Sequence, residues 1–322
     1  YLKLTQDEWF RKQFLILVTA IGLVLSGRVG IAHHAFSAEF DANAPVKGAP
    51  DDFSAIHIVT AMSAEDFAAR EEHALTLTRA WQRKLYDAGW AGRSWPTEYG
   101  GYGQAAWQDD VIAEEQGRYG VSNKMLAVAN EMVPPVLLQH GSHEQRLRHL
   151  PPIARGDEAW CQLLSEPDAG SDLTNVQAAA TAVDGGWVVS GQKVWTSNAT
   201  AADYALLLAR TDRSTPGRAG VSCFAIAMKQ DGVTVRPLRQ MSGAYHFNEV
   251  FLDDAFVPED GIIGGLGDGF AALRTMLTSE RAAIGGGTSA RSATQLRALA
   301  AELRRSSEPV VRQALARSYT RE

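Results

Sequence analysis

The sequence predicts an α+β chain with more than one domain, in which helical parts precede and follow a middle part built from strands. Three observations indicate this order. Residues 64–88 place apolar side chains at the three-and-four spacing of a helix. Residues 176–191 form two apolar runs around the Asp-Gly-Gly at 184–186, which is typical of a β-hairpin. Helical spacing then returns from Phe270.

Composition sets the class of protein. A length of 322 residues suits about two domains with a sizeable core, and 45% hydrophobic with 21% charged residues is ordinary for a globular protein. The net charge of -6 and the lack of a basic run argue against a nucleic-acid surface. Cys161 and Cys223 lie in strand-like contexts without a Cys-x-x-Cys partner, so we expect reduced core thiols.

The leader, residues 1–52, has no assigned function. The chain begins with Tyr1 instead of Met, which indicates a fragment. The apolar run at 14–25 is too short for a bilayer, which needs about 20 residues, so no membrane span is expected. The run resembles the core of a signal peptide with a small-residue site at 37–38, although a buried helix or a foreign stretch fits equally.

The N-terminal domain, residues 53–158, is expected to be helical. Ser63 begins a capping-box pattern with acids in the first turn, and Gly89 ends the helix that follows. A Gly/Pro/Tyr loop occupies 93–103. Further helices are expected at 105–119, at 122–139 with an interruption at Pro134-Pro135, and from Ser142 to Pro151.

Three histidines in this domain, His140, His143 and His149, raise the question of a metal. Their spacing fits no common zinc pattern, and no cysteine or acidic cluster accompanies them. We therefore expect surface or capping histidines and assign no metal ligand.

The middle domain, residues 159–262, is expected to be a small antiparallel barrel or sandwich. Strands are expected at 160–164, 176–183, 187–191, 204–208, 221–227, 233–235 and 249–256. The hairpin connects a hydroxyl-rich loop at 165–172 with a Trp-Thr-Ser loop at 195–197.

These two loops suit a flat heteroaromatic cofactor such as an isoalloxazine ring. Such a ring needs an aromatic wall, short hydrogen-bond donors at its edge, and backbone that comes close where glycine lacks a Cβ. The candidate donors are Ser165, Ser171, Thr196 and Ser197. Gly170 would allow the close approach of the backbone, and Trp195 would be the aromatic wall. The alternative is an ordinary turn-rich sheet with Trp195 in the core, and composition alone favours it.

A family resemblance changes this balance. The segments SEPDAGSDL, GQKVWTSN and DYALLLART resemble, in this order, the middle domain of the FAD-dependent acyl-CoA dehydrogenases. The similarity extends back to WQRKLYDAGWAGRSWPTEYGG and on to GDGFAALRTMLTSERAAIGG, and so covers roughly residues 64–287. The implied fold has a helical N-terminal domain, an antiparallel β-barrel middle domain and, at 263–322, a truncated C-terminal helical bundle.

The resemblance also implies a reaction. An acyl-CoA thioester would lose hydrogen from its alpha and beta carbons to give the 2,3-enoyl-CoA, with FAD as cofactor and an electron-transfer flavoprotein as electron acceptor. Family members are usually homodimers or homotetramers and intracellular, so a cytoplasmic location is expected, with export through the leader as the alternative.

Site residues follow from matching the motifs. The resemblance implies that the flavin is bound by Gln162, Leu163, Leu164, Ser165, Gly170, Ser171, Trp195, Thr196 and Ser197. It places Ser171, Thr278 and Arg281 beside the substrate and makes Glu280 the candidate base.

Glu280 has two interpretations. Family members like the long-chain and isovaleryl enzymes carry their base on this helix, whereas others carry it in the C-terminal part that this chain lacks. Apolar neighbours Met276, Leu277 and Ala282 would raise the pKa of the carboxyl, and pairing with Arg281 would lower it. The sequence leaves that balance open.

Some features depart from the family pattern. Gln162 stands where many members have an aromatic residue, Asp168 adds a charge to the loop, and the R-x-x-F-G segment that helps to bind FAD is absent. Helices expected at 292–305 and from Pro309 onward end the chain in mid-helix. A non-catalytic or heteromeric acyl-CoA-binding subunit, and an oxidase or monooxygenase, are therefore the alternatives.

Overall fold

The computed structural model describes residues 63–118, 124–241, 243–285, 297, 300–301 and 304–319. The leader at 1–52 and most of the helix expected at 292–305 lie outside the described residues. In the described part, no helix is both long and apolar enough to cross a membrane.

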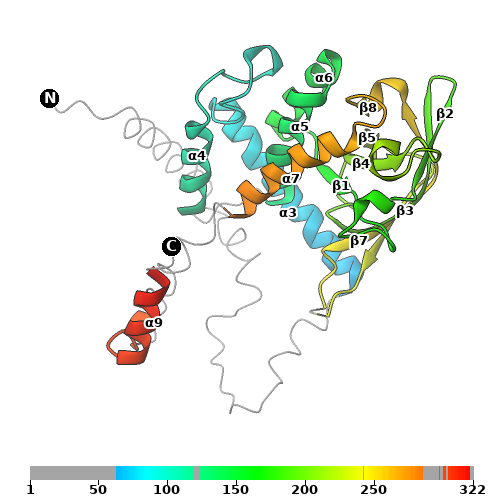
Figure 1. Ribbon diagram of the computed structural model, residues 1–322. Helices are drawn as coiled ribbons and strands as arrows, with labels where there is room; N and C mark the ends of the chain where they lie inside the picture. Colours follow the sequence, from blue (N-terminus) through cyan, green and yellow to red (C-terminus); the bar gives the residue numbers. More distant parts are fainter. Residues whose placement is uncertain are drawn as a thin grey trace.

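Helix α3 (Ala64–Asp87) begins and ends where the sequence predicts (Figure 1). The Ser63 hydroxyl accepts the Asp66 N–H at 3.1 Å, which satisfies one of the free donors at the helix start. Gly89 follows the helix with φ +75°, a conformation that glycine adopts without strain. The buried face, which includes Leu75 and Leu85, packs on the rest of the domain.

The helix predicted at 122–139 is interrupted earlier than expected. The helices after α3 are η2 (Thr97–Tyr99), α4 (Trp107–Arg118), η3 (Lys124–Leu126), the π-helix η4 (Val128–Met132), α5 (Val133–His140) and α6 (His143–Arg155). Pro134 and Pro135 lie in the first turn of α5, where a missing N–H leaves no intrahelical bond unmade. The π-helix directly before them provides the break.

Helix α6 corrects a predicted boundary, because it does not end at Pro151. Ser142 and Gln145 form the capping box at its start, and the helix continues through Pro151 and Pro152 to Gly156, where φ is +77°. Each internal proline removes a helical hydrogen bond. The turns around them bury Leu150 and Ile153 against the helical core, and this packing outweighs the lost bonds.

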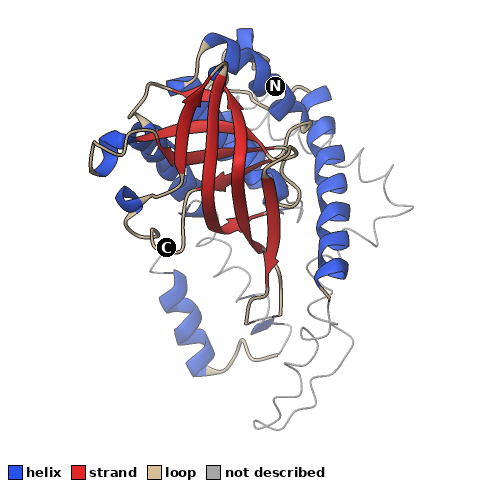
Figure 2. Cartoon of the chain, turned by 90° about the vertical axis from the view of Figure 1, so that its right-hand side faces the viewer, coloured by secondary structure: helices blue, strands red, loops and turns tan. Residues whose placement is uncertain are grey.

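Eight strands form one sheet, seen face-on in Figure 2. They are β1 (Trp160–Leu163), β2 (Ala179–Val183), β3 (Gly186–Ser197), β4 (Tyr204–Arg210), β5 (Val221–Ala227), β6 (Val233–Leu238), β7 (Phe247–Pro258) and β8 (Ile262–Ile263). Their order is β6-β7-β3-β2-β4-β5-β8, with β1 paired to β4. The predicted hairpin is the β2–β3 pair, which turns at Asp184 and Gly185.

Two features of the sheet correct the sequence-based expectation. The sheet is not purely antiparallel, because β4 pairs in parallel with β1 and, at one point, with β2. Strand β3 also continues to Ser197, so the expected Trp-Thr-Ser loop is the irregular end of a strand. The register of β3 on β7 shifts between Val189 and Gly191 and again between Lys193 and Thr196. These bulges break the period-two pattern that marks a strand.

The strands β1, β4 and β5 are buried on both faces. Leu207 and Phe224 point into a core inside the β-domain. Leu206 and Leu208 point into a second core that β4 shares with the helices. Because both faces of β4 are buried, its sequence is a continuous apolar run. Figure 1 shows α5, α6 and α7 (Gly269–Gly285) on the helical side of the sheet.

Both cysteines are free and buried, as the sequence predicts. Burial raises the pKa of the Cys223 thiol to about 12 and raises that of Cys161 as well. The last described helix, α9 (Pro309–Tyr319), begins at the predicted proline.

Candidate functional site

A buried ion pair between Glu166 and Lys193 lies beneath the predicted flavin loops. The Lys193 side chain is 0% exposed, and its Nζ donates to Glu166 Oε1 at 2.8 Å. The same ammonium donates to the carbonyl oxygens of Leu164 at 3.1 Å and Leu208 at 2.7 Å. Complete burial lowers the pKa of Lys193, and the carboxylate of Glu166 opposes this shift. All three N–H groups of the ammonium therefore have acceptors.

Glu166 also connects the hydroxyl-rich loop to the chain that follows it. Its carboxylate accepts the backbone N–H of Gln177 at 2.7 Å and of Ala178 at 3.0 Å. Its backbone exchanges two hydrogen bonds with Ala169. We call residues 165–172 the serine loop. The start of the serine loop is thus bonded, through one buried carboxylate, to the backbone at 177–178 beyond its end.

Arg210, at the end of β4, supports the far side of the serine loop. Its guanidinium donates to the carbonyl oxygens of Thr174 at 2.8 Å and of Val176 at 3.0 Å. The carboxylate of Asp172 accepts the Thr174 N–H at 3.0 Å. The arginine of the segment DYALLLART thus has a local structural role, because it holds the chain that leaves the serine loop.

Trp195 is the aromatic residue of the predicted site, and it is exposed. Its side chain is 63% exposed, and its ring meets Phe247 edge-on with centroids 6.1 Å apart. Its φ of +60° is unusual for a residue with a Cβ and lies within the second register shift of β3. A large apolar side chain that is strained and uncovered is typical of a binding site. The alternative that Trp195 is a core residue is wrong.

The serine loop lies directly beside Trp195. The backbone N–H of Val194 donates to the carbonyl of Ser165 at 2.9 Å. We call residues 194–197 the Trp195 bulge. Ser197 is exposed on the same side of β3 as Trp195, and Ser171 is exposed at the tip of the serine loop. Among the described residues, the hydroxyls of Ser165, Ser171 and Ser197 have no hydrogen bond within the protein, so they are available to a ligand.

Gly170 leaves room beside these hydroxyls. A Cβ added to it would meet no atom within 4 Å. The exposed indole, the free hydroxyls and this open space fit the edge and face of a flavin ring.

Two residues predicted to contact the flavin have side chains that point into the protein, away from Trp195. Thr196 is 2% exposed, and its side chain lies on the opposite face of β3 from Trp195, where its carbonyl accepts the Asn248 amide at 3.0 Å. Leu163 is buried in the core inside the β-domain. Alternation along a strand accounts for both, since neighbours of an outward residue point inward. Neither side chain reaches a ring bound on the outer surface.

Gln162 and Leu164, by the same alternation, point toward the helices. The Gln162 amide lies 2.8 Å from the Met132 sulfur of the π-helix, and Leu164 packs against the helical core. Gln162 is thus held by the protein itself.

Glu280 lies on α7, one turn after the buried Met276 and on the same face. It is half-buried, while Thr278 and Arg281 are exposed. Among the described side chains, Glu280 and Arg281 form no ion pair. The side chain of Ala282 lies outside the described residues.

Of the three histidines, His149 differs from the prediction, whereas His143 is exposed in the first turn of α6. His149 is buried, its ring lies 2.9 Å from Glu158 Oε2, and its edge meets Trp160. It is a core residue instead of a surface or capping one. His140 bonds Thr275 of α7 at 2.9 Å. Within the described ranges, no three His, Cys, Asp or Glu side chains gather as a metal site would require.

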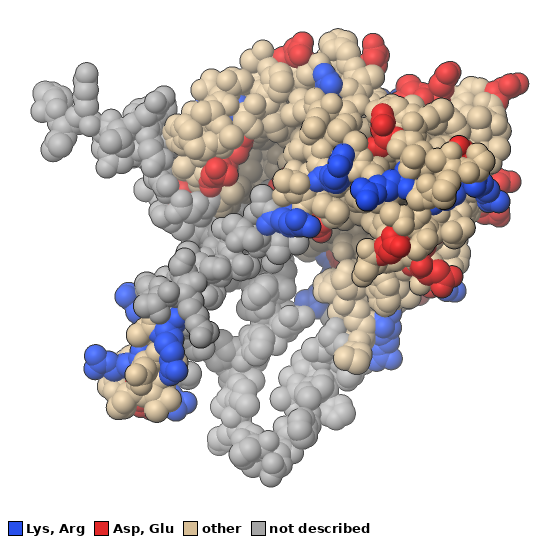
Figure 3. Space-filling model, in the orientation of Figure 1, with Lys and Arg blue, Asp and Glu red and all other residues tan. Residues whose placement is uncertain are grey.

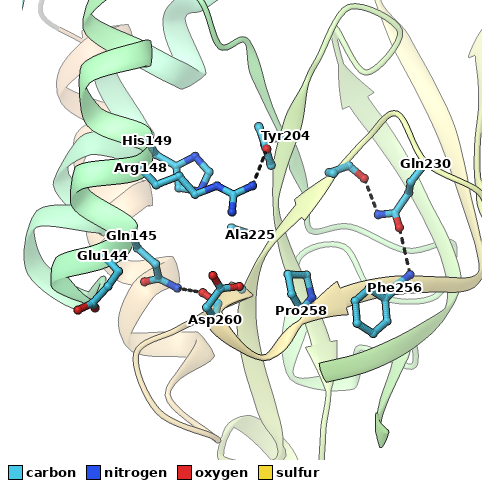
Figure 4. A pocket seen from close by; sticks show the side chains of 12 residues that line it. Glu144, Gln145, Arg148, His149, Tyr204, Ala225, Gln230, Phe256, Pro258 and Asp260 are labelled. Carbon is cyan, nitrogen blue, oxygen red and sulfur yellow. Dashed lines mark hydrogen bonds between the residues drawn. The ribbon is translucent and has the colours of Figure 1, made fainter. Parts of the chain in front are cut away.

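A cavity of about 390 Å³ lies away from this site, between α6 and the strands β4, β5 and β7 (Figure 4). Arg148 donates to the Tyr204 hydroxyl at 3.1 Å, and Gln145 donates to the Asp260 carbonyl at 2.6 Å. Gln230 bonds backbone on two sides. These groups are engaged with the protein, and no predicted site residue lines the cavity. We therefore do not assign the chemistry to it.

Comparison with known families agrees with this geometry. The model of the acyl-CoA dehydrogenase N-terminal domain matches residues 54–157, and that of the middle domain matches residues 161–255.

The chain belongs to the acyl-CoA dehydrogenase family.

Similar proteins of this family come from mycobacteria. The chain is 41% identical over 207 residues to the acyl-CoA dehydrogenase FadE34 of Mycobacterium tuberculosis. The matched region covers 64% of this chain and 29% of that protein. It is 37% identical over 254 residues to the acyl-CoA dehydrogenase IpdE1 of the same organism, covering 78% of this chain and 66% of that protein. The chain thus spans less than two thirds of either relative.

Solved acyl-CoA dehydrogenases share the fold. The Tcur3481-Tcur3483 steroid acyl-CoA dehydrogenase superposes with a TM-score of 0.68 at 29% identity, covering 79% of this chain and 67% of that one. The acyl-CoA dehydrogenase of Geobacillus kaustophilus does so with a TM-score of 0.68 at 28% identity, covering 80% and 70%. The ChsE4-ChsE5 complex of Mycobacterium tuberculosis has a TM-score of 0.66 at 25% identity, covering 85% and 74%.

Proposed function

We propose that the chain is the flavin-binding part of an acyl-CoA dehydrogenase that oxidises an acyl-CoA thioester to the 2,3-enoyl-CoA. The observation that carries this proposal is Trp195, an indole held out of the sheet at a strained φ beside free hydroxyls. Membership of the acyl-CoA dehydrogenase family supports the same chemistry.

FAD is the proposed cofactor, and when bound it would accept the hydride that leaves the beta carbon. Trp195 would cover one part of the ring. Ser165, Ser171 and Ser197 would donate to its edge, and Gly170 would leave it room. Thr196 and Leu163 are not part of this proposal, because their side chains are buried on the other face.

Glu280 is the proposed base that takes the proton from the alpha carbon. It is half-buried and lies on the same face of α7 as the buried Met276, which packs in the core that α7 shares with the other helices and the sheet. The exposed Thr278 and Arg281 would flank the substrate on the outer face of α7.

A basic surface near α7 supports a CoA thioester as substrate. In Figure 3, Lys and Arg side chains gather across the middle of the face that carries α7, although the chain has a net charge of -6. Arg274 and Arg281 are exposed on α7, and Arg218 is exposed on η6 (Gly217–Gly220), which packs against α7. Cationic side chains of this kind suit the phosphates of CoA. An electron-transfer flavoprotein is the proposed acceptor of the electrons.

A heteromeric assembly is the second candidate, beside a homodimer or homotetramer. The solved relatives include a complex of two named components, ChsE4 and ChsE5, and a pair named Tcur3481-Tcur3483. The missing R-x-x-F-G segment favours this alternative, because another subunit would then supply those FAD contacts.

The test is an anaerobic titration of the purified, FAD-loaded chain with a panel of acyl-CoAs. Substrate should bleach the flavin absorption band, and Glu280→Gln should abolish bleaching while FAD stays bound. Glu98→Gln, at an exposed position on η2, is the matched control and should bleach like the wild type.

Two results would contradict the proposal. A chain that binds no FAD, alone or mixed with a candidate partner, would remove the flavin function. Bleaching that persists unchanged in Glu280→Gln would remove Glu280 as base. Rapid reoxidation by oxygen in place of an electron-transfer flavoprotein would indicate the oxidase alternative.

A further inference from the structure

We propose that the buried pair of Glu166 and Lys193 is the positioning element of the flavin site, which holds the serine loop and the Trp195 bulge at one fixed spacing. This inference rests on the proposed function. It assigns the pair no contact with the cofactor, because Lys193 is fully buried and its three hydrogen bonds all go to the protein.

The carboxylate fixes the serine loop. Each oxygen of Glu166 accepts a backbone N–H beyond the loop, from Ala178 and Gln177, and one of them also accepts Lys193 Nζ. The loop between carries Gly170 and Ser171 at exposed positions. The carboxylate therefore connects the start of the loop with the backbone at 177–178, beyond its end.

The ammonium fixes the bulge. Lys193 is the last residue of β3 that keeps its register on β7 before the shift at which Trp195 turns outward with φ +60°. Its Nζ donates to the carbonyl oxygens of Leu164, the residue after β1, and of Leu208, in β4. The start of the bulge is thus tied to two other strands.

The two halves meet at one backbone bond. Val194 follows Lys193 and donates to Ser165, which precedes Glu166, at 2.9 Å. The ion pair and this bond together set the spacing between Ser165 and the indole of Trp195. A pair of apolar side chains would fill the same volume, but it would lack the directed bonds that define this spacing.

A buried ion pair contributes little net free energy to folding, because the cost of desolvating both charges offsets much of their attraction. A positional role explains why a charged pair is used here. It also predicts an effect on FAD that exceeds the effect on folding.

The experiment measures FAD affinity and the visible flavin spectrum of the full chain carrying Lys193→Met, Glu166→Gln or both. Each variant should weaken FAD binding by at least about tenfold and shift the flavin band, because misplaced donors and indole no longer match the ring. The double variant should fold better than either single one, since no buried charge is left unpaired, and it should still bind FAD weakly. Lys193→Arg, which keeps charge and donors, should restore part of the affinity.

Asp203→Asn is the matched control. Asp203 accepts Arg79 at 2.6 Å and Lys229 at 2.7 Å, and it precedes β4 at the end opposite to Leu208. Its loss should lower thermal stability but leave FAD affinity and the flavin spectrum unchanged. If Glu166 and Lys193 had only a structural role, their variants would behave like this control, with lower thermal stability but unchanged FAD affinity and flavin spectrum.

The outcomes separate the two proposals. A wild type that binds no FAD contradicts the proposed function itself. A wild type that binds FAD, with Glu166→Gln and the double variant binding equally well and with the same spectrum, overturns this inference. If Lys193→Met does not fold, Glu166→Gln decides alone, because it changes the fewest atoms and leaves Lys193 two carbonyl acceptors.

Discussion

At the scale of single residues, the direction of a side chain decides which predicted contacts are possible. The sequence indicates the right stretch for the ring, but it does not show that Trp195 points outward and Thr196 inward. The bulge in β3 sets these directions, and bulges carry no residue signature of their own here. Leu163 was assigned to the site with its neighbours, although alternation alone separates it from Gln162 and Leu164.

Replacing Trp195 with glycine tests whether the strained backbone serves binding. We expect Trp195→Gly to change the free energy of unfolding of the apoprotein by less than about 1 kcal/mol, because relief at φ +60° offsets the lost contact with Phe247. FAD affinity should fall strongly. Chemical denaturation and FAD titration measure the two effects, and a large loss of apoprotein stability would contradict a binding role for the indole.

Glu71 gives a prediction on pH. Burial raises the pKa of its carboxyl to about 7, against a hydrogen bond with Thr200 that lowers it. A raised pKa favours the protonated form in the folded chain, so this stabilisation is present at about pH 4.5 and is lost as pH rises through 7.

Denaturation between about pH 5 and pH 8 tests this prediction. The free energy of unfolding should fall by up to about 3 kcal/mol across that range, and Glu71→Gln should flatten the profile. A profile that is unchanged in Glu71→Gln would show that another group is responsible.

At the scale of elements, the sequence predicts that a helix or strand exists, and which of the two it is, better than it predicts the residues at which the element begins and ends. The strand β5 and the start of α3 match their predicted limits, because each is marked by turn or cap residues. Helix α6 runs past its prolines, since packing of Leu150 and Ile153 is a tertiary effect that the local pattern does not contain. The Trp-Thr-Ser stretch at 195–197 is predicted as a loop but is the end of β3, because the register shift between Lys193 and Thr196 breaks the alternation that marks a strand.

The end of α6 offers a matched pair of glycines. Gly156 and Gly217 have similar positive φ values, of +77° and +71°, but only Gly156 has a neighbour, the Gln82 Cβ at 2.9 Å from an added Cβ. We expect Gly156→Ala to lower the free energy of unfolding by about 1–3 kcal/mol more than Gly217→Ala does. Denaturation of both variants measures this difference, and equal losses would mean that α3 moves aside freely.

At the scale of the whole molecule, the sequence predicts the order of domains and the family. It does not predict that β4 pairs in parallel with β1, because that pairing depends on how the serine loop and the β2–β3 hairpin bring the chain back. This parallel pair places the ends of β1 and β3 side by side, and the predicted site exists only through that arrangement.

Added FAD should stabilise the full chain if the site is formed as described. A ligand at a hundred times its dissociation constant adds about 2.7 kcal/mol to the free energy of unfolding. The midpoint of thermal unfolding should therefore rise with FAD concentration, and riboflavin, which lacks the pyrophosphate and adenosine of FAD, should raise it less. No rise with FAD would contradict the cofactor assignment for the chain alone and would direct the search to a second subunit.

The two free thiols can serve as separate reporters of the two cores. Cys161 belongs to the core inside the β-domain, whereas Cys223 faces the core shared with the helices. Both are fully enclosed and weakly acidic, so an alkylating reagent added to the native chain has nothing to attack until one layer opens. Mass spectrometry of which sulfur is labelled first would then show whether the helices detach from the sheet before the sheet itself comes apart.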